Sequence, residues 1–263
     1  MMEEHQQSDL DSYEQGAVED VERLITQTDR VFYERQVEVL LESKYFHWVT
    51  SRAVRELENR RVIETRRCSG PYGSEVKTLR RTKYRYYKRE ETRLLDLIGR
   101  FSDPAVTSAI GARLEDLTLD GFARQQFVLI ARNTRQYRDR EWDASNHDLD
   151  FIFERDGLAL GIECKNTLSY IDPQELDTKL SLCDHLGITP VFVVRAMPKS
   201  WIEEVRQRAG FTLVLSWWLF PPLLTSLAND IRSVLDYRVG TPIALEDGTM
   251  RRFTNWWARL TNQ

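Results

Sequence analysis

The sequence predicts a two-domain α/β protein, with a small helical module followed by a mixed sheet flanked by helices. Three observations predict it. The chain has 263 residues, more than the roughly 150 of one average domain. Two amphipathic helices and a basic hairpin fill most of the first hundred residues, and strands and helices then alternate. The composition, 41% hydrophobic and 30% charged, is typical of globular proteins.

The composition also argues against membrane and disulfide-rich classes. The longest apolar stretch, residues 213–220, is far shorter than the roughly 20 residues that a membrane span requires. No cationic and apolar leader opens the chain, so we expect a cytoplasmic protein without a membrane partner. The scattered Cys68, Cys164 and Cys183 suit neither a disulfide framework nor paired zinc ligands. We expect free thiols.

Positive charge is concentrated in one block. Residues 44–100 hold 16 Lys and Arg against 7 Asp and Glu, whereas the rest of the chain holds 21 against 34. Such an asymmetry favours a polyanion such as DNA as the partner of this block.

The N-terminal elements follow in a recognisable order. Residues 1–18 lack apolar periodicity and are predicted to be a flexible acidic tail. Residues 19–101 are predicted to form the first domain. The patterns predict helices from residue 21, over 34–43 and over 47–60, then strands over 62–67 and 78–87 around a turn at 69–74. This order resembles a winged helix.

In a winged helix, the second helix of the pair enters the major groove and the hairpin approaches phosphates. The predicted nucleic-acid-binding residues on the helix are Arg52, Arg55 and Asn59. On the hairpin they are Arg80, Arg81, Lys83 and Arg85. The alternative is a solvated basic hairpin that holds subunits together.

The second domain is predicted to span residues 102–263, because Pro104 disfavours a helix through the residue before it. The patterns predict helices over 104–121, 172–186 and 199–209, and strands over 127–131, 149–154, 158–165, 190–195 and 211–220. The strand over 127–131 reads as buried. A C-terminal extension is expected to contain a hairpin at 242–249, and its Trp256–Trp257 pair either closes the core or forms a dimer contact.

Asp156–Gly157 predicts a two-residue hairpin turn with positive φ at both positions. That turn fixes the register of the flanking strands, so Asp150 faces Glu163 across the strand pair. Alternation places Lys165 on the same face as Glu163.

Two facing carboxylates repel each other, and a divalent cation removes that conflict. Mg²⁺ binds one or two carboxylates together with waters and phosphate oxygens, and Mn²⁺ is the alternative ion. A surface hairpin, with Lys165 paired to Asp148 and Glu163 solvated, explains the spacing equally well. Lys179, on the following helix, could contact a phosphate, but we expect it on a solvated helix face.

The run of Asp150, twelve residues, then Glu163-Cys164-Lys165 resembles the PD-(D/E)XK nuclease superfamily. The resemblance covers residues 104–220 and is closest to archaeal Holliday-junction resolvases and Mrr-like restriction endonucleases. It implies a core of a helix, three mostly antiparallel strands, a helix and another strand. Leu149 stands where the family name has Pro, and many members lack that Pro.

The same resemblance implies the residue roles. Asp150, Glu163 and the Cys164 carbonyl hold the metal, Lys165 assists the attacking water, and Glu115 is the acidic residue of the first core helix. The chain is therefore expected to be a Mg²⁺-dependent endonuclease of duplex or branched DNA, acting through a metal-activated water and, by analogy, as a homodimer. The alternatives are a DNA-binding regulator with a silent nuclease-like core, and a ribonuclease on the same core.

Overall fold

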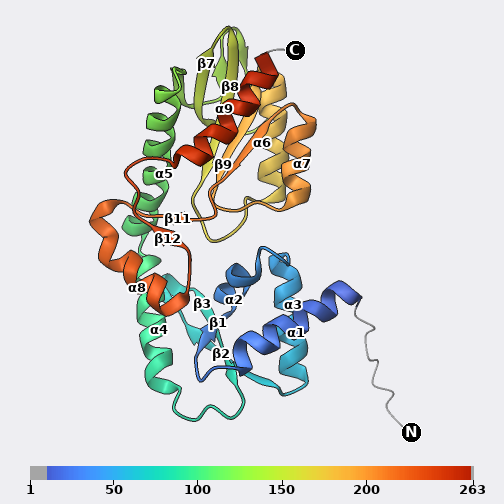
Figure 1. Cartoon of the computed structure of the whole chain (residues 1–263), viewed down its shortest axis with the longest axis vertical. Coiled ribbons are helices and arrows are strands. Elements are labelled where there is room, and N and C mark those ends of the chain that lie inside the picture. Colours follow the sequence, from blue (N-terminus) through green and yellow to red (C-terminus); the bar gives the residue numbers. More distant parts are fainter. Residues whose placement is uncertain (1–10, 262–263) are drawn as a thin grey trace. The chain divides into compact units, whose positions relative to one another are not determined.

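The computed structural model describes residues 11–261, which form two compact units (Figure 1). The first unit contains the chain up to Asp103 together with residues 230–237, and the second contains residues 104–229 and 238–261. The predicted mixed α/β class is confirmed, with a mixed sheet flanked by helices in the second unit. None of the helices within the described residues has the length and apolar character of a membrane span.

The first unit packs four helices with a three-stranded antiparallel sheet of order β1-β3-β2. Its elements are α1 (Ser12–Thr26), β1 (Phe32–Tyr33), α2 (Glu34–Leu41), α3 (His47–Asn59), β2 (Ile63–Ser69), β3 (Glu75–Arg81) and α4 (Lys88–Phe101). A short 3-10 turn, η1 (Pro71–Gly73), joins β2 to β3. The core forms where the apolar stripes of α1, α2 and α3 meet the sheet, and it includes Phe32, Leu57 and Leu79.

Two predictions for this unit need correction. Residues 12–18, expected in the flexible tail, form the first turns of α1, since the Asp11 side chain caps the helix at the Glu14 N–H and Ala17 and Val18 are buried. Residues 1–10 lie outside the described residues. The returning strand of the hairpin ends at Arg81 rather than residue 87, so Lys83 and Arg85 lie in the loop before α4.

Residues 230–237 belong to the first unit, although the sequence places them in the C-terminal extension. Buried hydrogen bonds explain this membership. The Tyr237 and Tyr33 hydroxyls lie 2.8 Å apart, and Gln36 Nε2 donates to the Leu235 carbonyl at 3.2 Å. These bonds join positions about two hundred residues apart, which a local pattern does not reveal.

The second unit is built on a five-stranded mixed sheet of order β10-β9-β8-β7-β4. The strands are β4 (Val128–Thr134), β7 (Leu149–Arg155), β8 (Leu158–Lys165), β9 (Thr189–Val194) and β10 (Phe211–Val214). β4, β7 and β8 are antiparallel, whereas β9 is parallel to β8 and β10 is parallel to β9. The parallel pairs are connected through α6 (Pro173–Leu186) and α7 (Lys199–Gln207).

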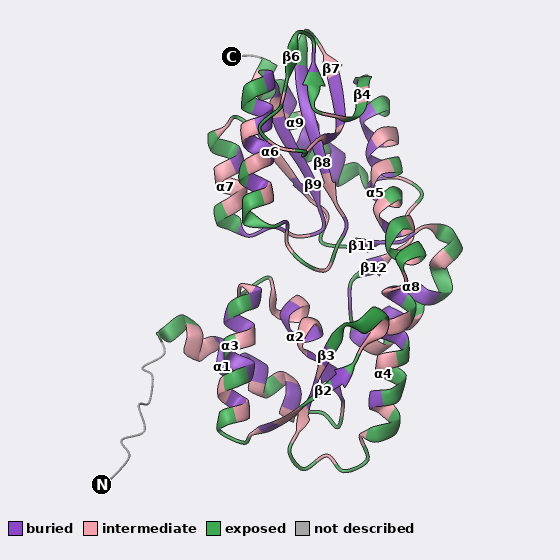
Figure 2. Cartoon of the chain, turned by 180° about the vertical axis from the view of Figure 1, so that it is seen from behind, coloured by how far each residue is buried: buried purple, intermediate pink, exposed green. Residues whose placement is uncertain are grey.

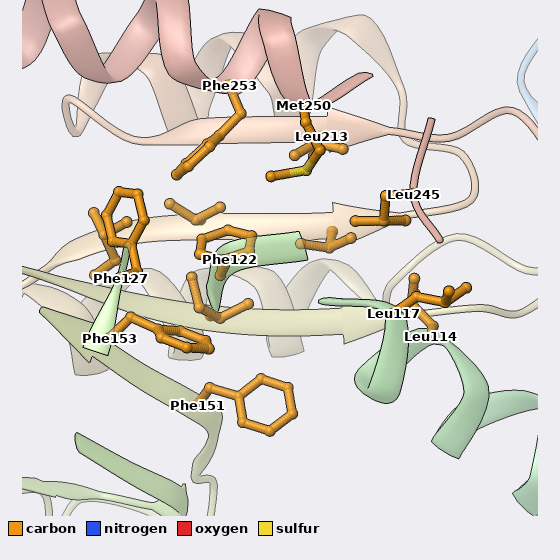
Figure 3. Packing of buried hydrophobic residues seen from close by; sticks show 14 of the residues in the cluster. Leu114, Leu117, Phe122, Phe127, Phe151, Phe153, Leu213, Leu245, Met250 and Phe253 are labelled. Atoms are coloured by element: carbon orange, nitrogen blue, oxygen red, sulfur yellow. The ribbon is translucent and has the colours of Figure 1, made fainter. Parts of the chain in front are cut away.

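Helices cover both faces of this sheet (Figure 2). On one face, α5 (Pro104–Arg124) and α9 (Asp247–Thr261) enclose an aromatic core with Phe122, Phe153 and Phe253 (Figure 3). On the other face, α6 packs through Leu180 and Leu182 against the sheet. The smaller elements are β5 (Gln136–Tyr137), β6 (Arg140–Glu141), β11 (Trp218–Leu219), η2 (Pro222–Leu224) and β12 (Val239–Gly240). The helix α8 (Thr225–Leu235) begins in this unit, and its residues from Asp230 onward belong to the first unit.

Three local predictions for the second unit are wrong. The strand expected over 211–220 ends at Val214, and Trp218–Leu219 form β11, which belongs to a separate two-stranded sheet. The residues Val128, Leu129 and Ile130 are exposed, because β4 is an edge strand of the sheet. No hairpin forms at 242–249. Instead β12 pairs in parallel with β11, and α9 begins at Asp247. The tryptophan pair of α9 contributes to the core, as Trp257 is buried and Trp256 stacks on Phe211.

Candidate functional site

The β7–β8 hairpin positions the candidate acidic residues. Asp156 and Gly157 both have positive φ, 51° and 78°, as the predicted turn requires. The ladder pairs Arg155 with Leu158 and continues to the Phe151–Ile162 pair, which confirms the predicted register over these residues. Asp150 and Glu163 follow one position beyond that last pair, at the end of the hairpin far from the turn.

Asp150 is joined to β8 by a hydrogen bond. Its Oδ2 accepts the Cys164 backbone N–H at 2.6 Å. The N–H and the carbonyl of one strand residue point to the same side of the strand, so the Cys164 carbonyl also points to the β7 side. Burial raises the pKa of the Asp150 carboxyl, while the Cys164 N–H opposes the shift.

Glu163 is the most buried acid of the site, with a side chain 3% exposed. Burial and the nearby Asp150 raise its pKa to about 7. Its two oxygens contact two lysines. Lys165 Nζ lies 3.2 Å from Oε1, and Lys179 Nζ lies 2.6 Å from Oε2.

Lys165 also pairs with Glu175 of α6, at 2.7 Å. Burial alone lowers the pKa of this ammonium, but Glu163 and Glu175 more than compensate, and the net shift is upward. Lys165 therefore acts as a cation in this arrangement. The sequence also allowed an ion pair between Lys165 and Asp148, but in the structure Lys165 pairs with Glu163 and Glu175 instead.

Lys179 is the residue that the sequence reasoning misjudged. It is buried rather than solvated, pairs with Glu163 and donates to the Asp148 carbonyl. The signal for this burial lies in the helical spacing: Leu176, Lys179, Leu180 and Cys183 follow the i, i+3, i+4, i+7 pattern of one helix face. α6 itself is well bounded, with Asp172 as N-cap, Pro173 in the first turn and a left-handed Gly187 at its end.

Glu115 lies on α5, half-buried, where the sequence predicts the helix acid. Burial raises the pKa of its carboxyl and Asp150 raises it further, while Arg132 opposes the shift. The neighbouring Asp116 is exposed. α5 therefore brings one further acid into electrostatic range of Asp150.

A second feature that the sequence reasoning missed is Asn166, directly after Lys165. This buried amide donates to the carbonyls of Ile110 and Leu219, at 2.8 and 2.6 Å, and accepts the Leu219 N–H at 3.1 Å. It therefore joins the end of β8 to α5 and β11. This tie fixes the backbone that carries Lys165.

The donor set suits a hard divalent cation held by few protein ligands. Asp150, Glu163 and the Cys164 carbonyl offer oxygen atoms only, and Mg²⁺ typically takes one or two carboxylates and keeps several waters. Within residues 11–261, no group of three or more His, Cys, Asp and Glu side chains is placed to share a metal ion. The residues fit a two-carboxylate site rather than a complete protein cage.

The predicted nucleic-acid-binding residues divide into two groups. Arg52, Arg55 and Asn59 lie on one exposed stripe of α3 that also carries Trp48. This i, i+4, i+7, i+11 spacing keeps them on one helix face. Arg52 is paired with Glu14 of α1.

The predicted hairpin residues are placed differently. Arg80 is largely buried, pairs with Glu64, and stacks over the Tyr87 ring at 3.7 Å. Arg81 pairs with Asp29. These two arginines therefore form contacts within the unit. Of the predicted hairpin residues, the exposed ones are Lys83 and Arg85 in the loop after β3.

No protein family, curated protein or solved structure matches this chain.

Proposed function

We propose that this protein is a Mg²⁺-dependent DNA endonuclease with a PD-(D/E)XK-type core and a winged-helix-like DNA-binding module. The observation that carries the proposal is the buried cluster at the end of the β7–β8 hairpin. There, Asp150 and Glu163 both have raised pKa values and lie among ammonium groups. Groups with shifted pKa values that gather in this way are characteristic of functional sites.

The order of elements supports the core assignment. The second unit runs α5, β4, β7, β8, α6 and β9, apart from the small β5–β6 hairpin. That is the order of helix, three antiparallel strands, helix and strand that the resemblance implies. The acidic residues come from the hairpin in the middle of this order, and Glu115 comes from the first helix.

Each residue has a role that follows from its chemistry. Asp150, Glu163 and the Cys164 carbonyl would hold the cation. When bound, Mg²⁺ activates a water and neutralises charge on the leaving oxygen. Lys165, an ammonium group that lies between Glu163 and Glu175, would orient the scissile phosphate and stabilise its charge in the transition state.

The order helix, strand, helix, helix, strand, strand in the first unit supports DNA binding. In a winged helix, α3 is the helix that enters the major groove. Arg52 and Arg55 on its exposed stripe suit contacts to phosphates or guanine edges. Because duplex DNA has two strands, we further propose that two copies of the chain act together, which light scattering on the purified protein tests.

The test is a cleavage assay with supercoiled plasmid, a four-way DNA junction and single-stranded RNA, each with Mg²⁺, Mn²⁺ or EDTA. We expect DNA cleavage with either metal and none with EDTA. Asp150→Ala and Lys165→Ala should each lose about 10³-fold in rate, because each removes several kcal/mol of transition-state stabilisation. The matched controls are Asp143→Ala and Lys199→Ala, which change exposed residues of the same unit.

The alternatives give different outcomes in the same assay. Cleavage that survives both substitutions would show that the site lies elsewhere. DNA binding without cleavage would indicate a regulator, and cleavage of RNA alone would indicate a ribonuclease.

A further inference from the structure

Four charged side chains of alternating sign run from α6 to β8 and back to α6. Glu175 contacts Lys165 at 2.7 Å, Lys165 contacts Glu163 at 3.2 Å, and Glu163 contacts Lys179 at 2.6 Å. Glu175 and Lys179 are four residues apart on α6, so they lie on one helix face. The proposed function assigns a role to Glu163 and Lys165 but none to Lys179.

Lys179 has a more restricted environment than Lys165. Its side chain is 5% exposed, against 29% for Lys165. A buried ammonium is costly unless it is paired and hydrogen-bonded. The Glu163 carboxylate and the Asp148 carbonyl meet this need for Lys179.

The Lys179 ammonium also acts on the other predicted metal ligand. It is the nearby cation that most strongly lowers the pKa of Asp150, against the larger effect of burial. The Lys179 ammonium therefore contacts Glu163 and lies within electrostatic range of Asp150. It lies where a cation is electrostatically favoured.

We propose that Lys179 is an internal counter-ion that competes with the divalent metal for Glu163, so that its displacement sets the metal affinity of the site. This inference rests on the proposed function, because it takes Glu163 as a metal ligand. A metal ion at the Glu163 carboxylate repels an ammonium group that contacts the same carboxylate, and the repulsion is strong in a buried site. One of the two ammonium groups that contact Glu163 must therefore move away when the metal binds.

Lys179 is the cation that moves. Lys165 keeps a second carboxylate, Glu175, when the metal takes Glu163. Among residues 11–261, the ion pair of Lys179 is with Glu163. The arrangement keeps the carboxylates compensated without metal and makes metal binding weaker than the ligands alone would give.

The test is Mn²⁺ binding to the full chain, measured from the electron paramagnetic resonance of free Mn²⁺. Lys179→Met removes the charge but keeps a long side chain that suits the apolar surroundings. We expect it to bind Mn²⁺ at least about tenfold more tightly than the wild type, because the competing charge is gone. Lys179→Arg keeps a cation and should not tighten binding, and Lys199→Met controls for the loss of an exposed charge.

Protein stability gives a second readout. Without metal, Lys179→Met leaves Glu163 with one ammonium fewer, so its unfolding temperature should fall. Mn²⁺ should then raise that temperature more than it does in the wild type. If Lys179→Met is unfolded without metal, Lys179→Gln is the second variant, and folding of either variant on addition of Mn²⁺ supports the proposal.

The outcomes separate this inference from the function on which it rests. Wild-type binding that Asp150→Asn abolishes, with no tightening in folded Lys179→Met, overturns the counter-ion role alone. If both variants are unfolded and Mn²⁺ restores neither, while the wild type binds Mn²⁺, the counter-ion role is overturned as well. If neither the wild type nor folded Lys179→Met binds Mn²⁺, the proposed metal site itself is wrong.

Discussion

Two acids of the first unit, Asp20 and Glu58, have pKa values that shift in the opposite direction from those of Asp150 and Glu163 in the second unit. In the first unit, a hydrogen bond from Lys44, at 2.8 Å, is the largest cause that lowers the pKa of Asp20. The pKa of Glu58 is likewise lowered, first by the Thr65 hydroxyl and also by Lys77. In the second unit, burial raises the pKa values of Asp150 and Glu163.

Under the proposed function, the difference is expected between acids that stabilise a fold and acids that bind a metal ion. A carboxylate with a lowered pKa is better off in the folded protein than in water. The first unit also contains one acid with a raised pKa, Glu34, whose pKa burial raises most and Lys77 and Arg55 lower in part. In the second unit, Asp150 and Glu163 lie together and Asp150 adds to the shift of Glu163. Such a pair is more costly without a cation than with one.

The largest expected effect is a loss of cleavage activity, which should differ between the two kinds of acid. Glu163→Gln removes a proposed metal ligand and should lower the cleavage rate by about 10³-fold, whereas Glu58→Gln in the first unit should leave it within about twofold. Single-turnover cleavage of a plasmid, at saturating protein, measures both rates. Equal losses in the two variants would mean that the pKa contrast does not mark the active site.

Mild acidification should affect the units differently. The Glu163 pKa of about 7 lies above its unfolded value of 4.5. Between these values the folded state binds the extra proton, so stability falls as the pH rises. We therefore expect the metal-free second unit to be more stable at pH 5 than at pH 7, by on the order of 2 kcal/mol.

The first unit should respond with the opposite sign and at lower pH. The lowered pKa of Asp20 gives stability that is present above pH 3.8 and is lost as the pH falls through the folded value. Hydrogen exchange of each unit, corrected for the intrinsic pH dependence, resolves the two responses. Glu163→Gln should remove most of the change in the second unit; a change that persists there would assign it to other groups.

The exposed cations of α3 provide a smaller contrast. The double variant with Arg52→Ala and Arg55→Ala should bind DNA about tenfold more weakly. The slope of log binding constant against log salt concentration should fall by the amount that about two phosphate contacts contribute. The control is Arg89→Ala with Arg93→Ala, which removes the same charge from exposed positions of α4. Fluorescence anisotropy across a salt series measures both slopes, and equal slopes would place the DNA elsewhere.

The smallest effect concerns the exposed partner of Asp20. Lys44 is 57% exposed, so Lys44→Ala should lower the free energy of unfolding by at most about 1 kcal/mol. Urea denaturation at pH 7 measures this change. A loss well above that value would show that acids of the first unit are as costly to leave unpaired as those of the second.

The sequence predicts those parts of the site that depend on local chemistry. The positive φ values that Asp156 and Gly157 adopt determine a register of two strands, and alternation then assigns the faces. In α3, helical spacing alone identifies the exposed stripe. The same register predicts that Asp150 lies opposite Glu163, whereas its hydrogen bond to the Cys164 N–H is not predicted.

The parts that could not be predicted depend on partners distant in the chain. The exposure of β4 depends on its place at the edge of the sheet, and Lys179 is buried because α6 crosses over the face that carries Glu163. Arg80 and Arg81 are engaged by acids from other elements of their unit. Residues 230–237 join the first unit through hydrogen bonds to residues near the start of the chain.

Asn166 has a consequence for how this site can vary. Among the described residues, its amide bonds to two carbonyls and one N–H of Ile110 and Leu219, main-chain groups that every residue except proline supplies. Substitutions at positions 110 and 219 therefore preserve the hydrogen bonds that join the helix to the strand, as long as the backbone keeps its conformation. A substitution at 166 has no such tolerance, because no change in either partner's side chain restores the lost amide.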